Sequence, residues 1–323
     1  MKKILVCGAA GFIGHHLVNY LKEKGHYVVG ADINKPKFED NCDEFYNYDL
    51  RLQDKVNDLF LDKHFDEVYQ LAANMGGAGF VFTGDNDADI MSSSTQIHLN
   101  ILSHYKHFDK IFFSSSACVY NESTQMDLGH PDCREEKAYP AGPDSEYGWE
   151  KLYAERLYQA YARNYGVNIR IARFHNINGV ECSWNNGKEK VPAAICRKVA
   201  MTKEGGEIEL WGDGLNERSF LYIDECLNGI NRLMASDFSG PVNIGSEEMI
   251  SINDLAKMVI NFSGKELNIN NIIDEGLPLG VRSRNSDNAL IKEKLGWVPD
   301  YPLKDGIKKI YDWVKEQVDN TNK

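Results

Sequence analysis

Short, mainly apolar runs alternate with helix-like segments through the first half of the chain. The runs lie at residues 4–7, 27–31, 67–73, 111–113 and 167–172. Apolar runs of this length are typical of parallel strands that are buried on both faces. The segments between them carry apolar residues at helical spacing, as at Leu17 and Leu21. This alternation predicts an α/β fold, a Rossmann-type doubly wound parallel sheet with helices on both faces.

A glycine-rich loop separates the first predicted strand from the first predicted helix. Residues 8–14 read GAAGFIG, and those expected to bind a dinucleotide are Gly8, Gly11, Phe12, Ile13 and Gly14. Glycines allow the backbone to turn tightly and to approach a pyrophosphate, whose charge the helix N-terminus stabilises. The loop therefore predicts a nucleotide cofactor, and a plain tight turn is the alternative.

The residues at the ends of the later predicted strands indicate which cofactor binds. Asp32 ends the second predicted strand, where its carboxylate would bind the adenosine ribose hydroxyls and repel a 2′-phosphate. NAD is therefore favoured over NADP, although Lys35 nearby keeps NADP open. Asp49 follows another short strand and could contact the adenine amino group. The further residues expected at the cofactor are Leu50, Leu71, Ala72 and Ala73.

Tyr147 and Lys151 are four residues apart in a predicted helix and therefore share one face. An ammonium beside the phenol favours the phenolate and would lower the pKa of Tyr147 from about 10 toward working pH. Ser116 ends an apolar run and could hydrogen-bond the same substrate hydroxyl. Together these side chains predict a device that removes a proton from an alcohol while hydride leaves its carbon.

Composition narrows the kind of partner and the compartment. The 323 residues carry a net charge of −12, which argues against a nucleic-acid or anionic-membrane partner. Seven cysteines, an odd number without a Cys-x-x-Cys pair, fit reduced thiols in a cytoplasmic protein. No stretch approaches transmembrane length, and no Cys/His cluster has zinc-like spacing, so we expect no metal.

The composition changes near residue 176, where polar and glycine-rich segments replace the regular alternation. We expect residues 1–175 to form an NAD-binding Rossmann domain, rejoined by residues 215–240 or thereabouts. Residues 176–323 are expected to form mainly a smaller, discontinuous C-terminal lobe that binds the substrate. The helix that begins near Tyr147, together with one near residues 90–107, could supply the face of a homodimer.

The glycine loop, Asp32, Ser116, Tyr147 and Lys151 together resemble the extended short-chain dehydrogenase/reductase family, which acts on nucleotide sugars. The resemblance covers nearly the whole chain. Within that family the chain resembles the plant-type GDP-mannose 3,5-epimerases. The stretches that carry this similarity are residues 75–77, 115–118, 189–194, 211–215 and 281–288.

The resemblance implies an NAD-dependent epimerisation of a GDP-sugar at C3 and/or C5. Tyr147 would act as the base for oxidation at C4, and Lys151 would hold the nicotinamide ribose. Once C4 is a ketone, C3 and C5 lie alpha to a carbonyl, and their protons become acidic. Cys118 and Lys190 would then be the acid/base pair on opposite faces of the ring. The residues implied for the GDP-sugar are Gly76, Gly77, Asn176, Glu189, Lys190, Lys198, Asn216, Arg218 and Arg282.

The residue type at position 118 distinguishes epimerisation at C3 or C5 from the alternative reactions. Related 4,6-dehydratases carry an Asp-Glu pair where this chain has Ala117 and Cys118, and simple 4-epimerases commonly have Thr in place of the cysteine. In a 4-epimerase or C4 dehydrogenase of a GDP-hexose or GDP-heptose, Cys118 would be a packing residue and Lys190 a surface lysine. A sensor or scaffold that binds NAD without turnover is a third possibility. Departures from the family pattern at Asn74 and Asn178 leave the sugar open.

Overall fold

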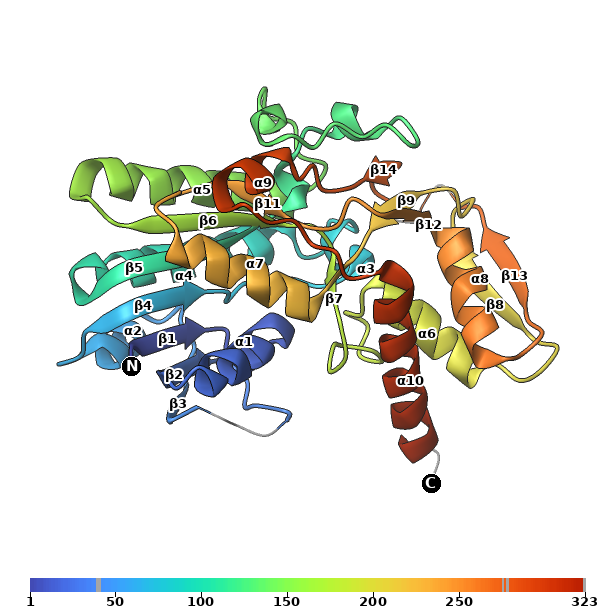
Figure 1. Cartoon of the computed structure of the whole chain (residues 1–323), viewed down its shortest axis with the longest axis horizontal. Helices are drawn as coiled ribbons and strands as arrows, with labels where there is room; N and C mark the ends of the chain where they lie inside the picture. Colours follow the sequence, from blue (N-terminus) through green and yellow to red (C-terminus); the bar gives the residue numbers. More distant parts are fainter. Residues whose placement is uncertain (39–41, 275, 277–278, 322–323) are drawn as a thin grey trace.

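A seven-stranded parallel sheet forms the centre of the computed structural model, which describes residues 1–38, 42–274, 276 and 279–321 (Figure 1). Its strands are β1 (Lys3–Cys7), β2 (Tyr27–Asp32), β3 (Glu44–Asn47), β4 (Phe65–Gln70), β5 (Phe108–Ser116), β6 (Ile169–Phe174) and β11 (Val242–Ile244). They lie in the order β11-β6-β5-β4-β1-β2-β3, and each neighbouring pair is parallel. The doubly wound sheet predicted from the apolar runs is therefore confirmed.

Helices cover both faces of this sheet because alternate strand residues point to opposite sides. One face carries α1 (Phe12–Glu23) and α7 (Ile223–Ala235), and the other carries α2 (Gln53–Phe60), α4 (Asp87–Leu102) and α5 (Glu146–Tyr165). In β1, Ile4 and Val6 share a hydrophobic cluster with α1 and α7. Leu5 and Cys7 belong to the cluster beneath α2, α4 and α5. Both faces are thus apolar, as a buried parallel strand requires.

Smaller sheets lie at the carboxyl ends of the large sheet's strands (Figure 1). They pair β7 (Ile177–Asn178) with β10 (Leu221–Tyr222), β8 (Glu207–Trp211) with β13 (Asn268–Ile272), and β9 (Glu217–Ser219) with both β12 (Met249–Ser251) and β14 (Ser283–Arg284). Helices α6 (Val191–Met201), α8 (Ile252–Ser263) and α10 (Leu303–Thr321) pack together beside them. Short elements complete the order: α3 (Ala78–Val81), α9 (Ala289–Leu295), η1 (Tyr105–His107), η2 (Ala117–Val119), η3 (Glu122–Gln125) and η4 (Glu135–Ala138).

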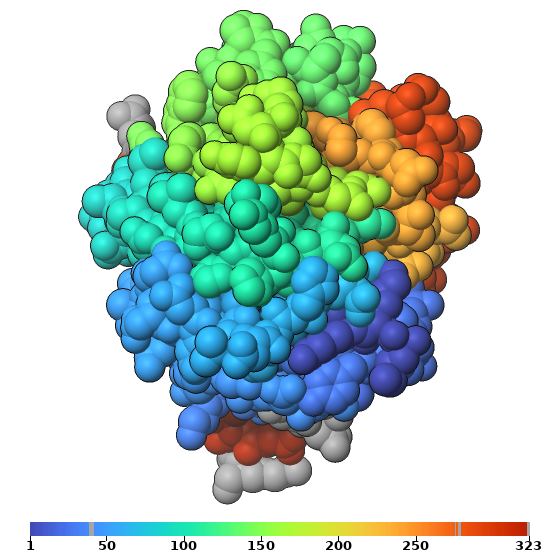
Figure 2. All heavy atoms as spheres, turned by 90° about the vertical axis from the view of Figure 1, so that its left-hand side faces the viewer, coloured from blue at the N-terminus to red at the C-terminus, as the bar shows by residue number. Residues whose placement is uncertain are grey.

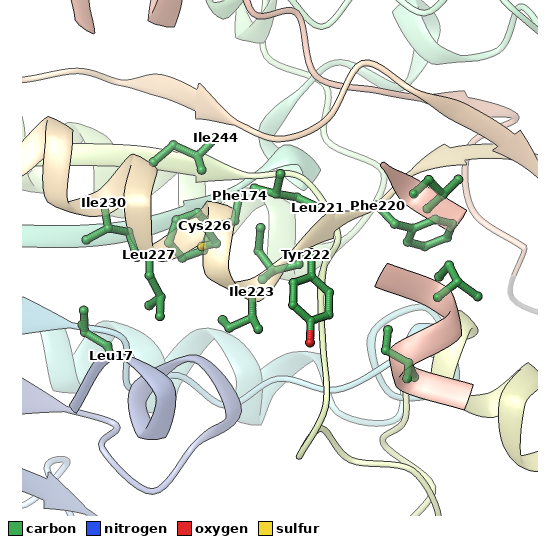
Figure 3. Packing of buried hydrophobic residues seen from close by; sticks show 14 of the residues in the cluster. Leu17, Phe174, Phe220, Leu221, Tyr222, Ile223, Cys226, Leu227, Ile230 and Ile244 are labelled. Carbon is green, nitrogen blue, oxygen red and sulfur yellow. The ribbon is translucent and has the colours of Figure 1, made fainter. Parts of the chain in front are cut away.

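One hydrophobic cluster joins the large sheet to the smaller sheets. Figure 3 shows Cys226, Leu227 and Ile230 of α7 lying between Leu17 of α1 and Ile244 of β11. The same cluster continues through residues 220–223 to α6, α8 and α10. Residues 223–244 therefore lie on the large sheet, whereas a domain boundary near residue 175 stays a prediction.

The two ends of the large sheet differ in what covers them. Figure 2 views the side that holds the amino ends of the strands, where chain segments of the first half occupy most of the surface in successive bands. The carboxyl ends face the smaller sheets, and ligands of doubly wound folds bind at that end. Within the described part of the chain, every helix is too short or too polar to span a bilayer.

Candidate active site

At two glycines of the loop between β1 and α1, the neighbouring backbone leaves no room for a Cβ atom. Gly8 has φ +86°, and a Cβ there would lie 2.8 Å from the backbone nitrogen of Ala72. A Cβ at Gly14 would lie 2.0 Å from the carbonyl oxygen of Gly8. This close approach of β1, α1 and the end of β4 exposes backbone at the helix N-terminus, so the loop fits a dinucleotide pyrophosphate.

Asp32 lies beside this loop with only 8% of its surface exposed. Its carboxylate accepts hydrogen bonds from the backbone nitrogens of Ala10 (3.0 Å) and Asn34 (2.8 Å). Burial raises the pKa of Asp32, and these hydrogen bonds oppose the rise. A carboxylate held at this position fits the ribose hydroxyls of NAD, which is the role expected for it.

Asp49 lies further along the same edge and already has a partner. Its carboxylate is bound by the guanidinium of Arg51 at 2.6 Å, and that hydrogen bond lowers the pKa of Asp49. The carbonyl oxygen of Leu50 accepts a hydrogen bond from Asn100 Nδ2 at 2.9 Å. Contact between Asp49 and an adenine amino group stays a prediction, and it would compete with Arg51.

Tyr147 reaches the end of β5 because the first turn of α5 packs directly on η2. A Cβ at Gly148 would lie 2.2 Å from the carbonyl oxygen of Cys118, so only glycine fits there. Ser145 caps the helix by accepting a hydrogen bond from the Gly148 nitrogen. The Cys118 nitrogen in turn donates to Ser116 Oγ at 3.2 Å. The structure thus brings Ser116, Cys118 and Tyr147 together.

Lys151 lies beside Tyr147, with Nζ 5.6 Å from the centre of the phenol ring. The expected effect on the phenol is nevertheless wrong for this structure. Burial raises the pKa of Tyr147, the charges of Cys118 and Glu150 raise it further, and only a hydrogen bond with Ser116 opposes them. The physical reason is that Tyr147 is 8% exposed and that Lys151 has its own counter-charge, because Glu150 Oε2 lies 3.7 Å from Nζ.

Arg284 is a site residue that the sequence analysis did not select. Its Nη1 donates to Cys118 Sγ at 3.2 Å, and its Nη2 lies 3.1 Å from Asp144 Oδ2. Burial lowers the pKa of Arg284, but the charges of Cys118 and Asp144 outweigh it and the net shift is upward. A guanidinium in contact with sulfur stabilises a thiolate. The 281–288 stretch pointed to this region, but nothing local distinguished Arg284 from Arg282.

Lys190 precedes α6 and is partly buried, unlike a solvated surface lysine. Burial lowers the pKa of Lys190, and the charge of Cys118 opposes this shift. The backbone before it touches the predicted sugar-binding loop, since a Cβ at Gly77 would lie 2.4 Å from the Glu189 carbonyl oxygen. A Cβ at Gly76 would meet Phe80 at 2.7 Å. Gly77 and Glu189 are therefore direct neighbours.

Cys118 packs among apolar residues on the same side of the site. Its cluster includes Tyr147, Val81, Ile90 and Phe80, and the cysteine itself is only partly buried. A thiol that is in contact with Arg284 and retains access to solvent differs from an enclosed packing cysteine. Its role as a carbon base stays a prediction.

Three residues predicted for the nucleotide lie in or directly before strands β9 and β14. Arg282 binds Asn216 Oδ1 at 2.7 Å and Asp213 Oδ2 at 2.9 Å. Arg218 donates to the carbonyl oxygen of Val281 at 2.6 Å, and burial, followed by the charge of Arg284, lowers the pKa of Arg218 to about 10. The structure therefore brings Asn216, Arg218 and Arg282 together.

Two other predicted substrate residues bond to backbone carbonyls. Lys198 Nζ donates to the carbonyl oxygen of Glu209 at 2.5 Å. Asn176 has φ +48° and donates from Nδ2 to the carbonyl oxygen of Ser219 at 2.9 Å. A positive φ at a non-glycine residue is strained, and such strain is often found at functional sites. Their contacts with a nucleotide stay predictions.

Comparison with known proteins agrees with this geometry. The profile of the NAD dependent epimerase/dehydratase family matches residues 4–245. GDP-mannose 3,5-epimerase from Arabidopsis thaliana is 45% identical over 322 residues, which cover 98% of this chain and 83% of the relative. No group of three or more possible metal ligands occurs in the described ranges.

Solved structures show the same fold over nearly the full length. UDP-glucose 4-epimerase from Thermotoga maritima has a TM-score of 0.85 and 25% identity, covering 98% of this chain and 99% of its own. UDP-glucuronic acid 4-epimerase from Bacillus cereus, solved with UDP-glucuronic acid and NAD, has a TM-score of 0.81 and 26% identity over the same shares. The chain therefore belongs to the NAD-dependent epimerase/dehydratase family, the extended short-chain dehydrogenases/reductases, and is an NAD-dependent enzyme of that family.

Proposed function

We propose that the protein is a nucleotide-sugar epimerase that inverts C3, C5 or both of a GDP-sugar through a transient 4-keto intermediate. The observation that carries this proposal is the contact between Cys118 Sγ and Arg284 Nη1, in the cluster that contains Tyr147. A 4-epimerase needs the alcohol-oxidising side chains alone. A thiol beside a guanidinium adds to these side chains a base that can remove a proton from carbon.

The chain's own residues divide the work as follows. Tyr147 takes the proton of the C4 hydroxyl, with Ser116 bound to the same oxygen. NAD, when bound, supplies a reversible acceptor for the C4 hydride. The Cys118 thiolate then removes a proton alpha to the new ketone, and Lys190 donates one from the opposite face. Burial lowers the pKa of Lys190, which makes it a better proton donor near neutral pH.

The similarity to GDP-mannose 3,5-epimerases supports a GDP-sugar as the substrate. Asn216, Arg218 and Arg282 supply amide and guanidinium groups, which suit a diphosphate and a polar base. The departures at Asn74 and Asn178 leave the sugar itself open, with a GDP-heptose or a modified GDP-hexose as alternatives to GDP-mannose.

A second candidate is a 4-epimerase or C4 dehydrogenase of a related GDP-hexose or GDP-heptose. The observation that favours it is the close structural match to two sugar-nucleotide 4-epimerases. That chemistry requires Ser116, Tyr147 and Lys151 but no carbon acid or base. A Cys118→Ala variant would then keep its activity.

The deciding experiment is incubation with GDP-mannose in heavy water, followed by mass spectrometry and proton NMR of the sugar. The proposal expects deuterium at C3, C5 or both, while C4 keeps its hydrogen. Cys118→Ala should lose the deuterium, whereas Cys196→Ala, which changes a buried cysteine of α6, should keep it. An inverted or oxidised C4 without deuterium at its neighbours moves the assignment to the second candidate.

We further propose a cytoplasmic homodimer that pairs through α4 and α5. These helices pack on each other, and exposed apolar or aromatic side chains lie along them at Leu99, Trp149 and Tyr153. Light scattering should give twice the chain mass, and Tyr153→Glu should shift the protein to the monomer. A wild-type monomer at all concentrations contradicts this part of the proposal.

A further inference from the structure

A buried group of charged and titratable side chains lies next to Tyr147, the base proposed for the oxidation at C4. Lys151 is 2% exposed, and the side chains of Glu150 and His98 are completely buried. Glu150 Oε2 lies 3.7 Å from Lys151 Nζ, and Glu150 Oε1 lies 3.0 Å from His98 Nε2. Burying a carboxylate is costly even when it is paired, and an apolar residue could fill the same space more cheaply. Packing alone therefore does not account for a charged residue at position 150.

The neighbours of His98 determine which of its nitrogens carries the proton. Its Nδ1 lies 3.3 Å from the hydroxyl of Tyr158 and 3.5 Å from Nε2 of Gln70, both of which can donate. Nδ1 is therefore the acceptor and Nε2, which lies 3.0 Å from Glu150 Oε1, carries the hydrogen. Burial lowers the pKa of His98, so the imidazole stays neutral.

Glu150 remains a carboxylate in these surroundings. Burial raises its pKa, but the charge of Lys151 and the neighbouring imidazole of His98 outweigh that effect, and the net shift is downward. The side-chain amide of Gln70 bonds both the nitrogen and the oxygen of Ala72, which fixes the orientation of the amide. Polar contacts thus run from Lys151 through Glu150, His98 and Gln70 to the end of β4, beside the cofactor loop.

We propose that Glu150, oriented by His98, is a positioning residue that holds Lys151 beside Tyr147 and limits how strongly its ammonium stabilises the phenolate. This inference rests on the transient oxidation at C4 proposed above. In that step the C4 hydroxyl proton would pass to the Tyr147 oxygen, with bound NAD as the acceptor of the C4 hydride, and the return step would reverse both transfers. Tyr147 must therefore give its proton back. A phenolate stabilised by an unopposed ammonium would be a poor donor, whereas a matched pKa serves both directions.

The groups that face Tyr147 and Lys151 come from several elements. Cys118 lies on η2, His98 on α4, and Glu150 and Tyr158 on α5. Among them, Cys118 and Glu150 raise the pKa of Tyr147 by charge. Replacing Glu150 by the isosteric glutamine removes one of these charges and leaves the ammonium of Lys151 unopposed.

The test is the Glu150→Gln variant of the full chain with NAD bound. The ionisation of Tyr147 is followed by tyrosinate absorbance, as the difference between each protein and the same protein carrying Tyr147→Phe. We expect the pKa of Tyr147 to fall by about one unit in Glu150→Gln and to stay unchanged in Glu150→Asp. An unchanged or higher pKa in Glu150→Gln overturns the proposal.

Glu155→Gln is the matched control, because Glu155 is a buried carboxylate of the same helix whose guanidinium partner is Arg173 at 2.8 Å. It should lower the unfolding temperature and leave the pKa of Tyr147 unchanged. His98→Leu is a second route if Glu150→Gln does not fold. It removes the imidazole that lies 3.0 Å from Glu150, favours protonation of that carboxylate, and should lower the pKa of Tyr147 by a smaller amount. No shift in His98→Leu counts against the proposal.

A kinetic measurement separates this inference from the proposed function. With GDP-mannose, Glu150→Gln should accumulate a larger share of reduced cofactor than the wild type, since the return of proton and hydride is slowed. An equal share in the two proteins contradicts the inference. If wild-type protein does not react with GDP-mannose, that choice of substrate fails, while the absorbance titration, which needs no sugar, still decides the role of Glu150.

Discussion

The Sγ of Cys118 and the guanidinium of Arg284 lie 3.2 Å apart, although 166 residues separate them in the chain. Arg284 reaches this position from β14, which pairs in parallel with β9. Cys118 lies in η2, which directly follows a strand of the large sheet, whereas Arg284 lies in a strand of a small sheet. The proposed carbon base and the guanidinium beside it therefore depend on the contact between the two sheets.

Arg284→Met should make Cys118 less reactive, because it removes the guanidinium that contacts Sγ at 3.2 Å. We expect alkylation of Cys118 by iodoacetamide at neutral pH to slow by about tenfold. Peptide mass spectrometry identifies the modified cysteine, and Cys118→Ala supplies the blank. Arg282→Met is the matched control, since Arg282 contacts Asp213 and Asn216 instead. Equal alkylation in the two arginine variants would contradict the prediction.

Lys190→Gln should block proton donation while leaving oxidation at C4 intact. We expect deuterium incorporation from heavy water to fall by about a hundredfold, with reduced cofactor still detectable by absorbance. In the wild type, Lys190 donates only while protonated. Because burial lowers its pKa, incorporation should be lost as pH rises, at a pH below the ordinary lysine value of 10.5.

The exposed Lys188 lies in the same segment and is the control for this variant. Lys188→Gln should incorporate deuterium at the wild-type rate. Loss of both oxidation and incorporation in Lys190→Gln would show instead that Lys190 is needed for binding.

Gly148→Ala should disturb both stability and the position of Tyr147. The added methyl would lie 2.2 Å from the Cys118 carbonyl oxygen, so α5 or η2 must move. We expect a loss of about 1–3 kcal/mol in the free energy of unfolding, measured by denaturant titration. Gly79→Ala is the control, because its Cβ would lie 3.8 Å from Trp211, an ordinary contact. Similar losses in both variants would argue against the packing explanation.

The buried ion pair of Arg173 and Glu155 should be costly to break from one side. Arg173→Met leaves Glu155 buried without its partner, and we expect a loss of about 3–5 kcal/mol in the free energy of unfolding. The double variant that also carries Glu155→Leu should recover a large part of that loss. Additive losses in the double variant would contradict this account of the pair.

His175 should make the protein sensitive to acid. Burial lowers its pKa from 6.5 to about 3, so the unfolded chain binds a proton that the folded protein does not accept. Stability is therefore fully present above pH 6.5 and falls as pH decreases toward about 3. His175→Gln should show a shallower decline in thermal unfolding over this window. Parallel curves for the two proteins would exclude His175 as the cause.

Local patterns were sufficient to predict the sheet and part of the site. The glycine loop is read directly from residues 8–14, and helix geometry alone places Tyr147 and Lys151 on one face. Both predictions depend on neighbours within a few residues. The positions of these residues at the strand ends then follow from the α/β alternation.

Long-range contacts account for what the sequence could not show. Arg284 meets Cys118 from a distant strand, and His98 meets Glu150 from another helix. The direction of the Tyr147 pKa was missed because its largest cause, burial, arises only in the folded structure. The charge of Glu150, in contrast, lies in the same helix, three residues from Tyr147. No spacing rule within one segment reveals a counter-charge that a different element supplies.

The continuous cluster around α7 limits how this enzyme could be recombined with its relatives. A chimera that exchanged everything after residue 175 would replace Cys226, Leu227 and Ile230, which share a hydrophobic cluster with Leu17 of the retained part (Figure 3). Its new helix would have to match a surface that it did not evolve with. Crossover points that keep residues 223–244 with the large sheet preserve that packing, and they leave the small sheets as the portion to exchange when a different sugar is sought.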